Sequence, residues 1–352
     1  MFNRFCLYFV FMITAASVLD ARSKTITIDM AVEYQTIENF AASDCWSFQK
    51  IGDWYTPQKE KVADLLFSVD KGIGLSAWRF NIGAGMNRVT IQNPWRTVET
   101  FEVSKGEYDW TRQEEERWFL QAAKERGVDQ FIAFVNSPPA RMTRNGYTNG
   151  TDGLGSTNLK TGYEGQFATY LTDILMHFRD HWDIEFDYVS PVNEPQWEWN
   201  SDSNQEGNRA SNDDIKRIVS ALTAELQKSG LKTQISLVES GNLESWYSTE
   251  PSISREYGAT YGNYLGELFD ELGSNPQIAS HLSGHSYWSD LVNGELVEHR
   301  RELFLKLLPY LNKGYQYWMS EYCVLEGPQG RGGYGRDLTI STALDVARVI
   351  HY

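Results

Sequence analysis

Two glutamates follow apolar runs at positions where the strands of a parallel sheet would end. Glu194 lies two residues after the run FDYVSPV, and Glu321 lies directly after YQYWMS. Glycoside hydrolysis needs two carboxyl groups: a protonated one donates to the leaving oxygen, and an ionised one attacks the anomeric carbon. The setting of these residues therefore favours cleavage of a glycosidic bond. Glu239, in SLVESGN, is an alternative partner in such a pair.

Polar or charged side chains also end the other apolar runs of the chain. In chain order they are Asp44, Arg79, Asn136, Asn193, Glu239, His285 and Tyr287. The reactive groups of a barrel of alternating strands and helices lie at the carboxyl ends of its strands, so these side chains are expected to share one cleft. Each also has a structural interpretation, such as a helix cap for Asp44 or the neutralisation of buried acid by Arg79.

Motifs of other chemistries are missing from the sequence. It contains no HExxH or CxxC pattern for zinc and no GxSxG for a nucleophilic serine. No GxGxxG turn follows the first strand candidate, although dinucleotide-binding folds place one there. We therefore expect neither a metal nor an organic cofactor.

Seven apolar runs, each suited to a buried strand, alternate with helical patterns. They are 39–46, 73–82, 130–135, 186–192, 234–238, 281–288 and 315–322. Strands that are apolar on both faces and alternate with helices predict a parallel α/β sheet that is covered on both sides. We interpret the chain as a (β/α)8 TIM barrel, and an open doubly wound sheet is the alternative.

The ends of the chain carry their own expectations. A barrel needs an eighth strand to close, and the sequence supplies seven, so we expect residues 38–352 to be a barrel truncated before strand eight. The alternating stretch TITIDMAVEYQTI, within residues 25–37, predicts two strands of an attached β-sandwich.

Helix starts are predicted from short capping signals. Thr56 and Pro57 are typical of an N-cap and the first helical residue, and two further pairs have capping-box spacing: Thr111 with Glu114, and Ser211 with Asp214.

Composition limits the partners and the location of the protein. The 352 residues hold 32 basic and 47 acidic side chains, a formal charge of −15, which opposes binding to nucleic acid and favours a neutral glycan. Residues 1–24 combine one early cation, a short apolar run and small residues, which is typical of a signal peptide. We expect a secreted or periplasmic monomer without a membrane anchor, in which Cys45 and Cys323 are free thiols.

Six short segments resemble the family-30 glycoside hydrolases of clan A. They are NFAASD (39–44), WRFNIG (78–83), NSPP (136–139), SPVNEP (190–195), HSYW (285–288) and MSEYCV (319–324). The resemblance begins near Thr36 and implies a retaining enzyme with a (β/α)8 barrel and an attached β-sandwich. The chain departs from the family pattern at Asn39 and Ala41, which replace glycines, and NSPP lacks a tryptophan that some members carry nearby.

The resemblance also implies roles for the matching residues. Glu194 would be the acid/base, Glu321 the nucleophile, and Asn193 would hold the 2-hydroxyl of the sugar. Arg79 and Tyr287 would orient the carboxylate of the nucleophile. The other residues expected to bind the innermost sugar are Asp44, Asn136 and His285.

Tryptophans follow several strand ends, where their flat rings would stack on sugars. Trp197 and Trp199 lie just after Glu194, and we expect Trp197 to contact the glycan. The other candidates for the wall of a groove are Trp46, Trp95, Trp246 and Trp288.

The unbroken SPVNEPQW most resembles the family members that cleave β-1,6-galactan or β-1,6-glucan. We therefore expect hydrolysis of a β-linked glycan by double displacement. The alternatives are a glucuronoxylanase-like or glucosylceramidase-like hydrolase, and a non-catalytic barrel that binds carbohydrate. The acidic composition disfavours a glycan recognised through glucuronic acid side chains.

Overall fold

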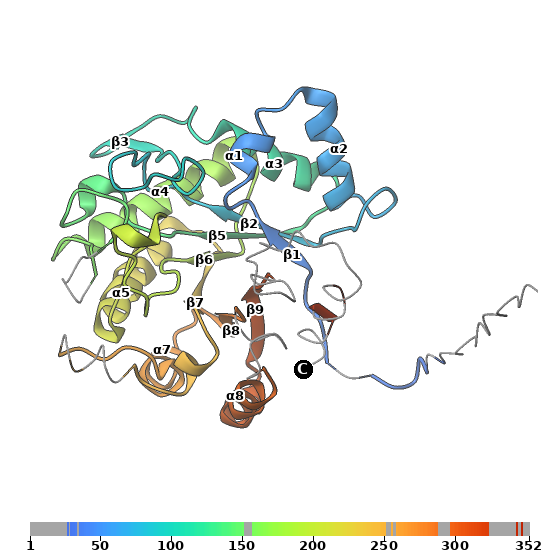
Figure 1. Cartoon of the computed structure of the whole chain (residues 1–352), viewed down its shortest axis with the longest axis vertical. Coiled ribbons are helices and arrows are strands. Elements are labelled where there is room, and N and C mark those ends of the chain that lie inside the picture. The colour runs from blue at the N-terminus through green and yellow to red at the C-terminus, as the bar shows by residue number, and fades with distance from the viewer. Residues whose placement is uncertain are drawn as a thin grey trace, which may run out of the picture. The chain divides into compact units, whose positions relative to one another are not determined.

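Seven parallel strands form one sheet, and their order across the sheet is the same as their order along the chain (Figure 1). They are β1 (Ala41–Ser43), β2 (Ala77–Asn81), β5 (Gln130–Phe134), β6 (Tyr188–Ser190), β7 (Gln234–Ser240), β8 (Ile278–His285) and β9 (Gln316–Glu321). All seven predicted strands are therefore present. A doubly wound sheet would reverse its strand order at a switch point. The unbroken order excludes that alternative and is the order of a TIM-barrel-like sheet.

The computed structural model describes residues 27, 29–33, 35–150, 157–250, 255, 258–287, 296–323, 343, 346 and 347. The chain divides into the units Met1–Glu38 and Asn39–Tyr352. No eighth strand joins the sheet within this described part, so the observed architecture is a parallel half-barrel. The signal peptide expected at residues 1–24 lies outside the described residues.

The strand pair expected at residues 25–37 is not seen in the part of that segment that the structure describes. The chain turns there instead, because Val32 N–H donates to the Asp29 carbonyl over 3.2 Å. A strand needs a neighbour to pair its backbone groups, and a turn within a few residues pairs them locally. The expected β-sandwich is therefore not shown.

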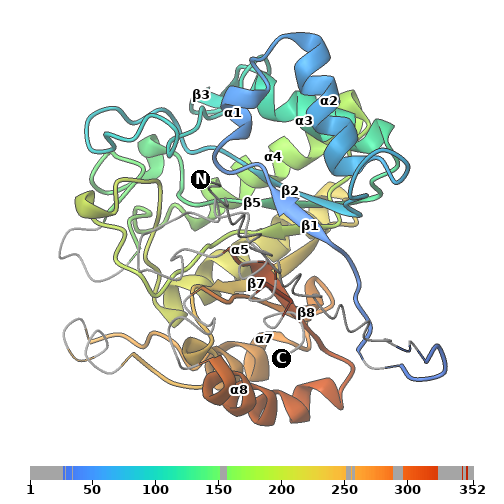
Figure 2. The same ribbon diagram turned by 45° about the vertical axis from the view of Figure 1, so that its right-hand side comes forward.

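Helices lie around the sheet (Figures 1 and 2). They are α1 (Phe48–Ile51), α2 (Thr56–Phe67), α3 (Glu114–Glu125), α4 (Glu164–Trp182), α5 (Asn212–Ser229), α7 (Asp270–Leu272) and α8 (Leu296–Leu311). Short helical segments are η1 (Ala140–Met142), η2 (Ser201–Ser203), η3 (Glu244–Trp246) and η4 (Leu265–Phe269). A separate antiparallel pair, β3 (Glu102–Ser104) and β4 (Glu107–Tyr108), lies between β2 and α3 in the chain. None of the helices among the described residues is long and apolar enough to span a membrane.

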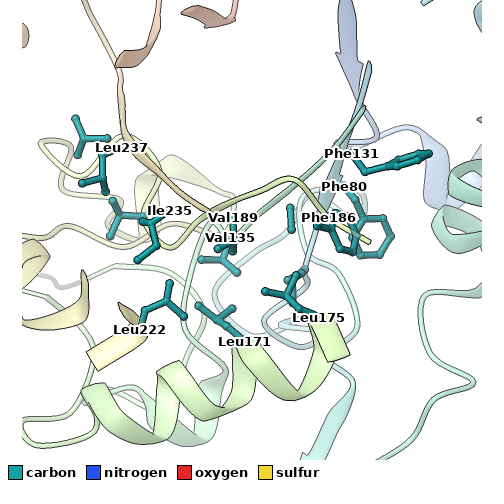
Figure 3. Close-up of a cluster of buried hydrophobic side chains, with 14 of the residues drawn as sticks. Phe80, Phe131, Val135, Leu171, Leu175, Phe186, Val189, Leu222, Ile235 and Leu237 are labelled. Carbon is teal, nitrogen blue, oxygen red and sulfur yellow. The ribbon is translucent and has the colours of Figure 1, made fainter. Parts of the chain in front are cut away.

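The core is packed between the sheet and helices α4 and α5 (Figure 3). Leu171 and Leu175 of α4 and Leu222 of α5 are at most 1% exposed, as are Val189 and Ile235 of the strands. Complete burial of each such side chain contributes about 1.5–3 kcal/mol. This packing holds the strands, and hence the groups at their ends, in fixed positions.

The predicted helix starts meet different outcomes. The capping box at α5 is confirmed: Ser211 accepts from the backbone of Asp214 at 3.2 Å, and Asp214 accepts from the backbone of Ser211 at 2.9 Å. The box predicted at Thr111 is wrong, because its hydroxyl donates to Asp109 at 2.6 Å and α3 begins later. At α2, Thr56 is the first helical residue and not the N-cap.

Candidate active site

Side chains from four strands, and from the loops after two others, converge at the carboxyl end of the sheet. Arg79 lies in β2 and Glu239 in β7, while His285 and Glu321 are the last residues of β8 and β9. His285 is the register partner of Glu321, so these two residues are adjacent. Asn136, Asn193 and Glu194 lie in the loops directly after β5 and β6.

Glu321 is held by three neighbours. Arg79 Nη1 donates to its Oε1, and the Tyr287 hydroxyl donates to its Oε2 over 2.8 Å. His285 Nε2 lies 3.5 Å from Oε1. Burial would raise the pKa of Glu321, but the positive charges of His285 and Arg79 outweigh it and lower the pKa below its ordinary value. Glu321 is therefore suited to remain an ionised carboxylate.

Glu194 has the opposite electrostatic setting. Burial, with a contribution from the charge of Glu321, raises the pKa of Glu194 against the opposing effect of His285. His285 Nδ1 lies 2.8 Å from Glu194 Oε1. The backbone of Glu194 is left-handed, with φ of 46°, and its N–H donates to the Glu239 carbonyl over 2.8 Å. This bond fixes the direction in which the side chain leaves the loop.

His285 lies completely buried between the carboxylates of three glutamates. Its Nδ1 faces Glu194, and its Nε2 is 3.3 Å from Glu239 Oε2. Burial by itself would lower the pKa of His285, but the charges of Glu321 and Glu194 raise it to about 10. Near neutral pH the ring is therefore an imidazolium with a proton on each nitrogen.

Glu239 is 1% exposed and has a partner at each carboxylate oxygen. Ser190 donates to Oε1 over 2.6 Å, and Ser320 donates to Oε2 over 2.5 Å. Arg79 Nη2 lies 3.4 Å from Oε2. Burial opposes ionisation, but the Arg79 charge and the His285 hydrogen bond keep the pKa of Glu239 far below its ordinary value. Sequence reasoning missed Ser190 and Ser320, because a serine in a strand carries no signal of its own.

A chain of amide groups continues the network away from the carboxylates. Asn193 accepts from Arg79 Nη2 at 3.1 Å and donates to Asn136 at 3.1 Å. Asn136 in turn donates to the side chain of Asn81 at 3.1 Å. The Asp44 carboxylate accepts from the backbone N–H of Asn81, at 3.0 and 3.1 Å from its two oxygens, and the Asp44 N–H donates to the Arg79 carbonyl over 3.0 Å.

The predicted site residues therefore separate into three groups. Those that contact a candidate catalytic glutamate are Arg79, His285 and Tyr287. Asn193 and Asn136 join the site through Arg79 and each other. Asp44 is 2% exposed, and burial, with the charge of Glu116, holds the pKa of its carboxyl well above the ordinary value. In the described part of the chain the Asp44 carboxylate bonds to Asn81 and to neither glutamate, so Asp44 lies at the edge of the site.

The predicted tryptophans also have different outcomes. Trp197 is half-buried, and its backbone N–H donates to the Glu194 carbonyl over 3.1 Å. Trp199 Nε1 donates to the same carbonyl over 3.0 Å. Trp246 is completely buried against Tyr264 and Phe269, so it packs in the interior and does not line a groove.

The other tryptophan candidates differ in their exposure to solvent. Trp95 is 45% exposed, Trp46 is half-buried, and Trp288 lies outside the described residues. Glu194, His285 and Glu321 each offer one potential ligand atom within 4.8 Å of the others. Pairing of an imidazolium with carboxylates accounts for this closeness, and we assign no metal to it.

Known proteins resemble this chain over most of its length. Residues 23–352 match the family model described as O-Glycosyl hydrolase family 30. An endo-β-1,6-galactanase of Hypocrea rufa is 27% identical over 252 residues, which cover 64% of this chain and 51% of that protein. The chain thus spans about half the length of this curated relative.

Two solved structures share the fold. A conserved exported protein from Bacteroides fragilis is 30% identical, with a TM-score of 0.79 over 92% of this chain and 68% of that one. An endo-β-1,6-glucanase is 19% identical, with a TM-score of 0.61 over 86% of this chain and 61% of that one. The second likeness is one of fold alone.

Proposed function

The chain belongs to O-glycosyl hydrolase family 30, and from that premise we propose that it hydrolyses a β-linked glycan with retention of configuration. In this proposal Glu321 is the nucleophile and Glu194 is the acid/base. The observation that carries it is the closeness of the two carboxylates, each of which places an oxygen within 4.8 Å of the other. Retaining enzymes separate these groups by about 5–5.5 Å, whereas inverting enzymes need roughly 6.5–9.5 Å to admit water.

The opposed pKa shifts of the two glutamates support the same roles. Glu321, with a lowered pKa, is ready to attack the anomeric carbon, and Glu194, with a raised pKa, holds a proton for the leaving oxygen. Attack forms a bond from Glu321 to the anomeric carbon while the glycosidic bond breaks and Glu194 gives up its proton. The first product leaves with that proton.

The second step reverses the proton transfer. Esterification removes the charge of Glu321, and that charge is one of the factors that raise the pKa of Glu194. The pKa of Glu194 then falls, so its carboxylate can accept a proton from water while the water oxygen attacks the anomeric carbon. The bond to Glu321 breaks, the sugar is released, and both glutamates return to their starting states.

The substrate we propose is a β-1,6-linked galactan or glucan. The relative from Hypocrea rufa carries the name endo-β-1,6-galactanase, and its 27% identity supports a related glycan. Trp197 supplies a half-buried aromatic ring beside the loop of Glu194, where a sugar face would stack. The net charge of −15 fits a neutral polysaccharide.

Export and domain organisation complete the proposal. We propose that residues 1–24 are a signal peptide, that residues 25–37 belong to a side β-sandwich, and that residues 38–352 belong to the catalytic barrel. The name of the Bacteroides fragilis relative, a conserved exported protein, supports export.

The test is release of sugar by the full chain from β-1,6-galactan, β-1,6-glucan and xylan. We expect turnover of a β-1,6-glycan, with the anomeric configuration of the first product retained in early NMR spectra. Glu194→Gln and Glu321→Gln should each lower kcat by at least about 100-fold. Glu107→Gln, which changes an exposed glutamate of β4, should keep the wild-type rate.

Two results would contradict the proposal. Binding of these glycans with no turnover by the wild-type protein would favour a carbohydrate-binding barrel. Wild-type rates in either Glu194→Gln or Glu321→Gln would remove that residue from the pair, and Glu239→Gln would be the next variant to test.

A further inference from the structure

Glu239 lies in the middle of the site but cannot reach a substrate. It is 1% exposed, and both of its carboxylate oxygens accept hydrogen bonds from serine hydroxyls, Ser190 on β6 and Ser320 on β9. A nucleophile or general acid needs an oxygen that can approach the glycosidic bond. The geometry therefore argues against a catalytic role for Glu239.

Its remaining contacts all lead to residues that serve the reaction. Glu239 Oε2 lies 3.3 Å from His285 Nε2 and 3.4 Å from Arg79 Nη2. The opposite nitrogen of the imidazole, Nδ1, lies 2.8 Å from Glu194 Oε1. A carboxylate, an imidazole and a carboxyl group are thus joined in one line from Glu239 to Glu194.

The backbone of Glu239 reaches the same target by a second path. Its carbonyl accepts the N–H of Glu194 over 2.8 Å, and both residues are left-handed, with φ of 52° and 46°. Such a conformation is unfavourable in a residue with a side chain, so the surrounding structure must hold it. Side chain and backbone of Glu239 therefore both bear on the position of Glu194.

We propose that Glu239 is a positioning residue, which fixes the ring of His285 with Nε2–H donated to Glu239 and Nδ1 directed at Glu194. Through the orientation of this ring, Glu239 acts on the protonation of Glu194, which in the proposed mechanism donates a proton in the first step and accepts one in the second. The inference rests on the proposed retaining hydrolysis for its meaning, but its geometry can be tested without any glycan. A carboxylate that accepts from one ring nitrogen fixes the orientation of the ring and stabilises its protonated form.

Several charged groups act on the ring together. Glu194, Glu239 and Glu321 face His285 from three different elements, and Tyr287 packs edge-on with ring centroids 5.7 Å apart. Arg79 bridges Glu239 and Glu321. The negative charge of Glu239 also acts to raise the pKa of His281 and that of Tyr317. Because these residues are electrostatically coupled, removal of one negative charge lowers the pKa values of the others.

The experiment is NMR of histidine labelled with 15N in the ring, in the wild-type chain and in Glu239→Gln. The chain has six histidines, and a His285→Asn variant assigns the signal. We expect wild-type His285 to carry protons on both nitrogens at pH 7 to 8. In Glu239→Gln, which keeps the shape of the side chain, the ring should lose a proton at a pH lower by about one unit or more.

Glu206→Gln is the matched control. Glu206 is also completely buried, but its Oε1 accepts from the backbone of Val98 at 2.7 Å and from the Thr97 hydroxyl at 3.3 Å, away from His285. The titration of His285 should be the same in Glu206→Gln as in the wild type. In assays, Glu239→Gln should lower kcat by about 10- to 100-fold with little change in KM. The alkaline limb of its pH–rate profile should move to lower pH.

Three results would overturn the inference. An unchanged His285 titration in Glu239→Gln would show that the carboxylate does not act on the ring. A wild-type His285 that is neutral with its proton on Nδ1 would exclude donation from Nε2 to Glu239, and this measurement needs no variant. Restoration of Glu239→Ala activity by azide would make Glu239 a catalytic residue. Failure to hydrolyse any glycan, with the expected NMR result, would count against the proposed function alone.

Discussion

At the scale of single residues, one arginine organises the contacts of Glu321, the proposed nucleophile. The guanidinium of Arg79 donates to Glu321 and Asn193, lies 3.4 Å from Glu239, and stacks 3.4 Å above the ring of Phe134. A planar group with several fixed donors can serve all these partners at once, whereas an ammonium cannot. The shape of Arg79 is therefore as important as its charge.

Arg79→Lys should separate shape from charge. The variant keeps a cation beside Glu321, so the acid limb of the kcat/KM profile should stay close to its wild-type pH. The lysine cannot hold Glu321, Glu239 and Asn193 together, and the misplaced nucleophile should lower kcat/KM by about 100-fold. A wild-type rate with a normal melting temperature would contradict a positioning role for the guanidinium.

Tyr287→Phe removes a single atom from the same carboxylate. The lost hydroxyl donates to Glu321 Oε2 over 2.8 Å and helps to lower the pKa of Glu321. Without it the pKa of Glu321 rises, so the acid limb of the kcat/KM profile should move to higher pH. A hydrogen bond to a charged group contributes about 1.5–3 kcal/mol, so the rate should fall roughly 10- to 100-fold. An unmoved acid limb would show that the hydroxyl does not act on the nucleophile.

At the scale of elements, the loops after β6 and β7 are joined across their backbones and side chains. The Glu194 N–H bonds to the Glu239 carbonyl. The loop after Glu194 places the indole of Trp197 against Gly241, the residue directly after β7. A Cβ atom at Gly241 would lie 2.2 Å from Trp197 Nε1, a distance that no packed structure accepts. The absence of a side chain at Gly241 therefore decides where the indole lies.

Gly241→Ala should displace Trp197 and leave the carboxylates in place. If the indole stacks on a sugar as proposed, KM for the β-1,6-glycan should rise about tenfold while kcat changes less, since one aromatic contact contributes about 0.5–1.5 kcal/mol. Gly165→Ala, at a position of α4 where an added Cβ meets nothing within 4 Å, is the control and should leave KM unchanged. Equal KM in both variants would remove Trp197 from the binding surface.

Two capping signals of the same spacing allow a matched test of helix stability. Ser211→Ala deletes the side-chain cap of α5 and should cost about 1 kcal/mol in the free energy of unfolding, measured in urea. Thr111→Ala removes a hydroxyl that donates to Asp109 in an exposed turn and does not cap α3, so its cost should be within about 0.5 kcal/mol. Equal costs would mean that the Ser211 bond adds nothing to stability.

At the scale of the whole molecule, buried acids couple stability to pH in opposite directions. Burial raises the pKa of Glu116 to about 7 and that of Glu206 to about 8. The pKa of Glu239 and that of Glu321 are lowered. An acid with a raised folded-state pKa contributes stability at low pH that is lost as pH rises through that pKa. One with a lowered pKa contributes stability that is lost as pH falls.

Glu206→Gln should therefore flatten the stability profile between pH 5 and pH 8. In the wild type, the unfolded state releases this proton near the ordinary value of 4.5 and the folded state near 8, so stability falls across that window. The variant has no proton to lose, and should gain about 1–3 kcal/mol relative to the wild type at pH 8 compared with pH 5. Parallel unfolding profiles of the two proteins would contradict the assignment.

The sequence by itself determined the seven strands, their parallel order and the capping of α5. These features depend on local patterns: apolar runs fix which segments are buried, and Ser211 and Asp214 lie within one helical turn of each other. It also selected Glu194, Glu321, Arg79, His285 and Tyr287, since residues at strand ends of a parallel sheet share one edge. The capping box predicted at Thr111 was wrong because the Thr111 hydroxyl bonds to the neighbouring Asp109 and does not cap α3.

Only the tertiary structure decided what each of these groups does to the others. Glu194, Glu239 and Glu321 are alike in sequence, and their opposed pKa shifts arise from where Arg79 and His285 lie in three dimensions. The burial of Glu239 and Trp246, and the contact of Trp197 with Gly241, depend on segments that are distant along the chain. Charge and packing act through space, and so a physical reason for the different roles proposed for the three glutamates came only from the assembled strands.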